Sequence, residues 1–127
     1  MSLIKKQSNH SVTDTMDKFE ALVKSKDMTV FARINHTANA SSVDLEMNDA
    51  EVLIFGNPKG GTLIMKKDPA ASLDLPLRVA VYADDAGDVF ISYHDQHGLG
   101  ALYDVKGVPV LDVVTEALDN LTNAVIA

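Results

Sequence analysis

The residues best suited to binding chemistry stand between positions 57 and 62, in the order Asn-Pro-Lys-Gly-Gly-Thr. Asn is a favoured helix N-cap and Pro is favoured at the first helical position, so a helix is expected to begin here. The first turn of a helix carries backbone N–H groups without helical partners, and Gly60 and Gly61 would let a ligand approach them closely. With Lys59 and Thr62 as further donors, this segment predicts a site for a small anionic ligand.

The same segment also has a purely structural interpretation. Asn57 would cap the helix, Pro58 would start it, and the two glycines would only allow the helix to pack tightly against the preceding strand. The Gly-x-x-x-x-Gly-Lys spacing of a nucleotide-binding P-loop is absent. Both interpretations place a helix here, and they differ in whether its first amide groups are free to bind a ligand.

His36 is the candidate for acid–base chemistry. It ends the segment 28–36, in which alternate residues share a face, and this alternation places His36 on the same face as Val30 at the end of a strand. An imidazole can act near neutral pH as a general base or as a ligand-binding donor, with Asn57 or Lys59 stabilising a developing oxyanion. The alternative is a histidine whose hydrogen bonds are purely structural.

His94 and His97 stand three residues apart and would share a helical face if a helix began by residue 94. A metal ion needs at least one more protein ligand, and the candidates are Glu46, Asp74 and His36. Alternatively, His94 ends a strand, Asp95 caps the next helix and His97 lies in solvent. We adopt this second interpretation and predict neither a bound metal ion nor a cofactor.

Periodic patterns along the chain predict the elements that hold these residues. Strands are expected at 3–7, 28–36, 51–55, 77–83 and 89–93. Helices are expected between Ser11 and Lys26, over 58–67 and from Pro109 onwards. Connections are expected at 37–50, where a turn of helix could precede an extended piece, and at 70–76. The turn cluster at 84–88 makes the last two strands a hairpin, which is antiparallel. The pattern therefore predicts an α+β sandwich.

Length and charge bound the function further. The 127 residues contain no internal repeat and predict a single domain over 1–127. The formal net charge is −7, with 18 acidic residues dispersed among 11 basic ones, so no basic surface for nucleic acid is expected. No apolar run approaches the ~20 residues of a membrane span, and the absence of Cys excludes thiol chemistry. The protein is expected to be cytoplasmic as written, or periplasmic if a leader was removed.

Four segments together resemble the pattern of the DUF302 family, in order and approximate spacing, and they are 29–36, 55–62, 74–77 and 92–93. The resemblance covers nearly the whole chain. It implies a TATA-binding-protein-like β-α-β(4)-α fold, with an antiparallel-rich sheet and helices packed on one face, and a homodimer. It implies no known reaction. Asp74 and Tyr93 lie in these segments and join the candidate ligand-binding residues, whereas Asn35 departs from the family's frequent aspartate and leaves His36 without a charged partner.

Three functions are compatible with these patterns. The favoured one is a non-catalytic small-ligand-binding or interaction module, a homodimer whose sheet face and 57–62 turn enclose a pocket. The alternative is a hydrolase-like or acid/base enzyme, which requires His36 and the 57–62 turn to meet at one cavity. The third is a structural partner domain, which would expose a contiguous apolar patch.

Overall fold

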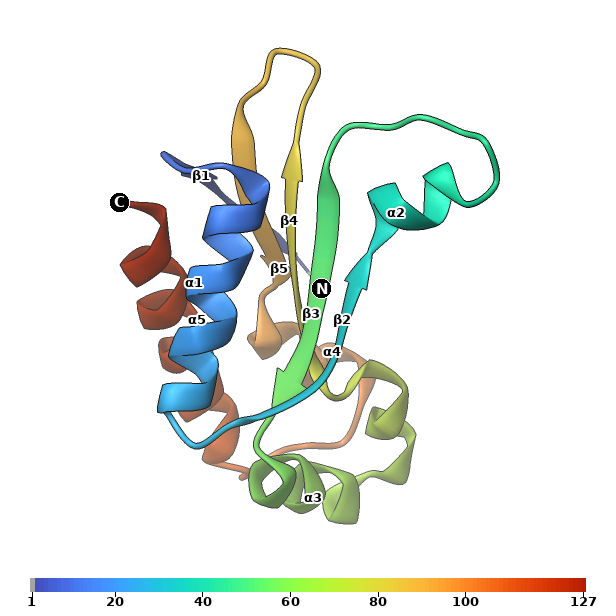
Figure 1. Ribbon diagram of the computed structural model, residues 1–127. Helices are drawn as coiled ribbons and strands as arrows, with labels where there is room; N and C mark the ends of the chain where they lie inside the picture. Colours follow the sequence, from blue (N-terminus) through green and yellow to red (C-terminus); the bar gives the residue numbers. More distant parts are fainter. Residues whose placement is uncertain (1) are drawn as a thin grey trace.

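A five-stranded antiparallel sheet forms the centre of the protein in the computed structural model, which describes residues 2–127 (Figure 1). The strands lie in the order β1-β5-β4-β3-β2, so that β2 to β5 follow one another as a meander and β1 pairs with the free edge of β5. Their bounds are β1 (Leu3–Ser8), β2 (Thr29–Asn35), β3 (Ala50–Gly56), β4 (Leu77–Ala83) and β5 (Val89–His94).

Two long helices, α1 (Val12–Ser25) and α5 (Val110–Ile126), pack together on one face of this sheet (Figure 1). With the shorter helices set aside, the chain has the order β-α-β(4)-α. The predicted α+β sandwich, with its antiparallel sheet and helices on one face, is confirmed. The shorter elements are α2 (His36–Ser41), α3 (Pro58–Lys67), α4 (Leu99–Leu102) and the 3-10 turns η1 (Pro69–Asp74) and η2 (Gln96–Gly98).

The main core lies between the two long helices and the sheet. α1 begins where predicted, because Ser11 Oγ accepts a hydrogen bond from the Asp14 amide at 3.1 Å. Its fully buried Phe19 meets Phe55 of β3 edge to face, with ring centroids 5.3 Å apart. α5 contributes the predicted apolar stripe, of which Leu118 and two later residues reach this core.

A bulge in β2 corrects the face assigned to His36. The register between β2 and β3 shifts between Val30 and Ala32, so Phe31 is an extra residue in the ladder. A one-residue shift exchanges the two faces for every later side chain. Arg33 therefore points towards α1 and bonds its carboxylates, while His36 is exposed and is the first residue of α2.

Two segments that were expected to be connections contain short helical turns. The segment 37–50 includes most of α2, and the segment 70–76 includes most of η1. Side-chain oxygens of Asn35 and Asp68 cap these turns. Turns of six residues hold too few apolar positions to show a helical period, and local caps of this kind decide their conformation instead.

A second, smaller core lies beyond the end of the sheet. It is built by α3, η1 and α4, which gather at the lower end of the molecule in Figure 1. Its buried members are Ile64, Ala71, Leu99 and Val105. The first turns of α5 pack on it through the half-buried Val110 and Leu111, while the later turns belong to the main core. α5 thus spans both cores, and the space between them lies along its first half.

Candidate functional site

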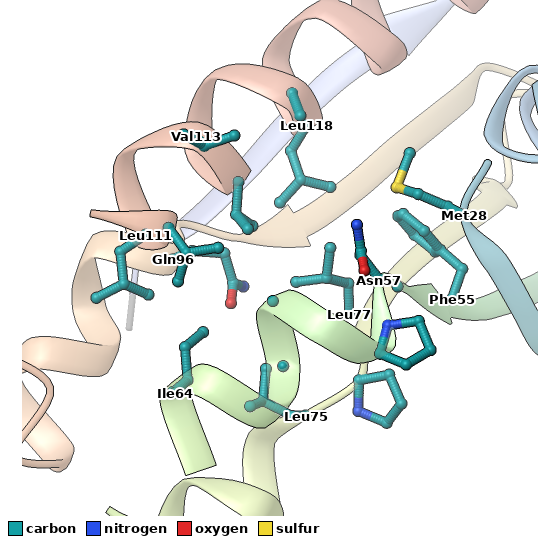
Figure 2. A pocket seen from close by; sticks show the side chains of 18 of the residues that line it. Met28, Phe55, Asn57, Ile64, Leu75, Leu77, Gln96, Leu111, Val113 and Leu118 are labelled. Atoms are coloured by element: carbon teal, nitrogen blue, oxygen red, sulfur yellow. The ribbon is translucent and has the colours of Figure 1, made fainter. Parts of the chain in front are cut away.

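A cavity of about 730 Å³ lies between the two cores (Figure 2). Its walls are the first turns of α3, the first half of α5, the segment entering β4, the start of β2 and the end of β3. Most of the lining side chains are apolar, including Met28, Phe55, Ile64, Leu77 and Leu118. Protein interiors rarely leave gaps larger than a water molecule, so a space of this size is a candidate ligand site.

Helix α3 is held against α5 by a glycine. A Cβ atom added at Gly60 would stand 3.1 Å from Val110 Cγ2, which is tighter than ordinary van der Waals contact. The absence of a side chain at Gly60 therefore sets how closely the two helices approach. Both residues line the cavity beside this contact. The structural interpretation of the glycines expected tight packing against the preceding strand, whereas the close contact at Gly60 is with α5.

The first turn of α3 does not present the row of free amides that an anion site needs. Asn57 Oδ1 accepts a hydrogen bond from the Lys59 amide at 3.0 Å, and the Asn57 carbonyl accepts one from the Gly61 amide at 2.9 Å. Pro58 has no N–H group. The Lys59 amide is therefore not a free donor, because the cap side chain takes up its hydrogen bond, and the Gly61 amide makes the first bond of the helix itself.

The predicted binding residues divide into two groups. Four of them line the cavity, and they are Asn57, Gly60, Gly61 and Thr62. Lys59 is exposed and does not line it. Tyr93 is 5% exposed and belongs to the main core, and Asp74 accepts a hydrogen bond from the Tyr103 hydroxyl instead of facing the cavity.

The bond between Tyr103 and Asp74 joins η1 to the end of α4. It raises the pKa of the Tyr103 hydroxyl, because the proton donated to a carboxylate is held more firmly, and burial and the charges of Asp74 and Asp68 add to the effect. The Asp104 amide also donates to Asp68 Oδ2 at 2.9 Å. Asp74 therefore serves the second core as a structural acceptor.

His36 lies at the opposite end of the sheet from the cavity. Gly56, which precedes the α3 cap, pairs with Thr29 at one end of β2, whereas Glu51 pairs with Asn35 at the other. Five residues along a strand separate these pairs by roughly 17 Å. The structure therefore does not bring His36 to the 57–62 turn, and the combined catalytic site required by the enzyme hypothesis is not formed.

The other two candidate histidines lie near η2. His94 ends β5, as expected, and its side chain is exposed. His97 Nδ1 and Nε2 each lie 3.4 Å from a carboxylate, on Asp95 and Asp112 respectively. Asp95 caps η2 through the His97 amide at 3.1 Å. Within residues 2–127, no three His, Asp or Glu side chains gather as metal ligands would.

Gln96 is a cavity residue that the sequence patterns did not indicate. It is the first residue of η2, only 8% exposed, and its Nε2 donates to the His94 carbonyl at 2.9 Å. Its Oε1 is buried without a hydrogen-bond partner. Figure 2 shows the amide group directed into the space near Ile64 and Leu77. A glutamine between two histidines carries no periodic signal, so only the packing of the two cores could show that it is buried.

The fold and cavity define a small α+β domain with an apolar cavity between two cores, and comparison with known proteins agrees with the fold. Residues 4–127 match the family model "Domain of unknown function DUF302", and the chain belongs to this family. An uncharacterised conserved DUF302 protein from Bacillus stearothermophilus has the same fold in its crystal structure. The TM-score is 0.75, with 16% identity, covering 99% of this chain and 96% of that one.

Two longer relatives are more similar in sequence. They are the proteins named "Fluoride-specific ion channel FluC 1" in Brucella suis biovar 1 and in Brucella abortus biovar 1. Each is 37% identical over 109 residues, which cover 81% of this chain. The same match covers 43% and 40% of their respective lengths, so the chain spans less than half of either relative. Within residues 2–127, no helix has both the length and the apolar character needed to cross a bilayer.

Proposed function

We propose that this domain is a non-catalytic module that binds a small, largely apolar molecule in the cavity between α3 and α5. The observation that carries the proposal is the cavity of about 730 Å³ with its mainly apolar lining. Ligand sites of this kind commonly enclose roughly 300 to 1,000 Å³ and are lined by hydrophobic side chains with a few polar groups.

The chemistry of the lining supports binding over catalysis. Among the residues that the structure describes, Lys26 is the one charged side chain that lines the cavity, and no His, Asp or Glu is included. General acid–base catalysis needs a titratable group within hydrogen-bond reach of the substrate. His36, the candidate base, is at the far end of β2. The enzyme hypothesis therefore lacks support from the arrangement of its residues.

The ligand proposed here differs from the small anion that the 57–62 turn suggested. An anion would need donors, and the amides of Lys59 and Gly61 are already bonded to Asn57. The same argument applies to fluoride, the ion in the names of the Brucella relatives. We infer that fluoride is not the ligand of this cavity, because apolar side chains cannot replace the hydration of a small anion.

The experiment uses paired phenylalanine substitutions on α5. Ala117 lines the cavity, whereas Ala124 is exposed on the same helix and does not line it. We expect the unmodified chain to bind the uncharged fluorescent dye N-phenyl-naphthylamine saturably. Ala117→Phe should weaken binding by about tenfold or more because the new ring occupies the space, and Ala124→Phe should leave binding unchanged.

Two results would contradict the proposal. One is dye binding that Ala117→Phe leaves intact in a variant that still unfolds cooperatively. The other is no saturable binding by the unmodified chain. Phosphate and acetate serve as the anionic comparison, and we expect neither to raise the melting temperature. An increase that is lost in Lys59→Ala would favour the anion site instead.

We also propose that the domain forms a homodimer through the sheet face that α1 and α5 do not cover. Strand alternation places Val52 and Ile54 on this face, opposite the buried Leu53 and Phe55, and both are only half-buried. Tyr82 and Phe90 extend the surface, with ring centroids 6.0 Å apart. Two cationic side chains share this face, because Arg78 pairs with Ile54 and Lys5 Nζ lies 4.1 Å from the Phe90 ring centroid. An uncovered sheet face that carries half-buried apolar side chains can pair with a second copy of the chain.

A further inference from the structure

We propose that the molecule held in the cavity carries an uncharged hydrogen-bond donor, a hydroxyl or an amide N–H, that binds Gln96 Oε1, with the rest of the molecule apolar. This inference rests on the proposed function and specifies its ligand class. It begins from a buried acceptor without a partner. Gln96 is 8% exposed, lines the cavity, and its Oε1 makes no hydrogen bond.

The orientation of the Gln96 amide is determined by its neighbour. Nε2 donates to the His94 carbonyl at 2.9 Å. Rotating the amide by half a turn would bring two acceptor oxygens together, which is unfavourable. The nitrogen must therefore face the His94 carbonyl, which directs the oxygen towards the apolar side chains of the cavity wall, where it is buried. Because β5 ends at His94 and Asp95 caps η2, elements of the fold hold the backbone on both sides of Gln96.

A buried acceptor is costly to leave unpaired, so the native state should supply it with a donor. Figure 2 shows Ile64, Leu75, Leu77 and Leu111 around the Gln96 amide, and all four are apolar. A water molecule held in the interior typically needs two to four polar partners. The surroundings of Gln96 suit the single donor of an otherwise apolar molecule better than a water molecule.

The apolar surroundings of Gln96 also favour a donor group without charge. A carboxylate or phosphate offers only acceptors to Oε1, and an ammonium group would need a buried carboxylate to offset its desolvation. Within residues 2–127, no Asp or Glu lines the cavity. An uncharged hydroxyl or amide N–H on an apolar body is therefore the chemistry that completes this site, as in alkylphenols and long-chain alcohols.

The test compares two probes that share an apolar body, of which one carries a hydrogen-bond donor and the other has a methyl group in place of the donated hydrogen. Para-butylphenol carries a hydroxyl, and para-butylanisole carries a methoxy group on the same apolar body. Titrating the full chain by calorimetry, we expect the phenol to bind about tenfold more tightly than the anisole. In Gln96→Met, which keeps a long side chain but removes the acceptor, the two affinities should become equal. Gln7→Met, at an exposed position of β1, should retain the tenfold difference.

The outcomes separate this inference from the proposed function. Equal affinity of both probes for the unmodified chain would overturn the role of Gln96 and leave the apolar cavity intact as a binding site. A phenol preference that survives in Gln96→Met would also overturn it. Binding of neither probe would overturn both proposals. If Gln96→Met does not fold, the comparison of the two probes in the unmodified chain still decides the question.

Discussion

Arg33 holds three carboxylates together beneath α1. It donates to Glu51 of β3 at 2.8 Å, to Asp17 at 2.7 Å and to Glu20 at 3.0 Å. The bond to Glu51 is the largest cause of the raised pKa of the Arg33 guanidinium. The Glu51 side chain is nearly buried, at 9% exposure. A carboxylate in that position depends on its partner, because an unpaired buried charge is strongly unfavourable.

We therefore expect Arg33→Met to lower the free energy of unfolding at neutral pH by about 2 kcal/mol, since it leaves Glu51 without a donor. The matched control is Lys24→Ala. Lys24 pairs with Glu20 at 3.1 Å but its side chain is 62% exposed, and such pairs contribute about 0.5 kcal/mol or less. Urea denaturation of both variants measures the difference. Equal losses would show that Arg33 acts as an ordinary surface charge.

The Glu20 carboxyl group determines how the stabilising effect of Arg33 changes with pH. Hydrogen bonds from Lys24 and from Arg33 lower the pKa of its carboxyl group below the ordinary value. A carboxyl whose pKa is lower in the folded state contributes stability above its unfolded pKa, and this contribution is lost as the pH falls through the folded pKa. The difference in free energy of unfolding between Arg33→Met and the unmodified chain should therefore become smaller below about pH 4.

At the scale of elements, α1 and α3 begin in the same way at different places. Ser11 Oγ accepts from the Asp14 amide at 3.1 Å and Asn57 Oδ1 accepts from the Lys59 amide at 3.0 Å. Both caps were predicted from residue type. The sequence did not decide whether amides in the first turn of α3 are free to bind a ligand. The Lys59 amide is not free, because it donates to the Asn57 side chain.

We expect Asn57→Ala to cost about 1 kcal/mol of stability and Ser11→Ala to cost a similar amount, because each leaves one helical amide without its acceptor. Asn57→Asp should retain most of the stability, since a carboxylate also accepts this bond. Thermal unfolding of the three variants measures these changes. If Asn57→Ala leaves the stability unchanged, the side chain contributes little as a cap and is free for another role.

The bulge in β2 shows why strand alternation alone misplaced one residue. A period of two predicted Val30, Ala32, Ile34 and His36 on one face. The register shift after Val30 moves the later residues to the other face. This shift lets Arg33 reach the carboxylates of α1. No local pattern encodes the bulge, because it is stabilised by partners on α1 and β3 that are distant in sequence.

At the scale of the whole molecule, α1 and α5 cover one face of the sheet and leave the other to solvent or to a partner (Figure 1). If two copies meet at the second face, a charge placed in it should separate them. We expect the unmodified chain to sediment at twice its mass of 13.7 kDa and Ile54→Lys to sediment as a monomer at micromolar concentration.

The control is Leu73→Lys, which places the same charge at an exposed apolar position of η1, away from the sheet. It should leave the association unchanged. Sedimentation velocity distinguishes the monomer from the dimer directly. A monomeric unmodified chain, or a dimer that persists in Ile54→Lys, would exclude this face as the dimer surface.

The sequence by itself determined the order of strands and helices and the caps at Ser11 and Asn57, because these depend on periodicity and turn chemistry within short segments. Motifs in four short segments indicated the family, and the resemblance implied the β-α-β(4)-α fold. Only the tertiary structure decided where the candidate site lies. The cavity forms where α5 bridges two cores. Its unpaired acceptor, Gln96 Oε1, is buried by segments far from it in the chain. Burial and the loss of hydrogen-bond partners arise when distant segments pack together, so the spacing of residues along the chain does not predict them.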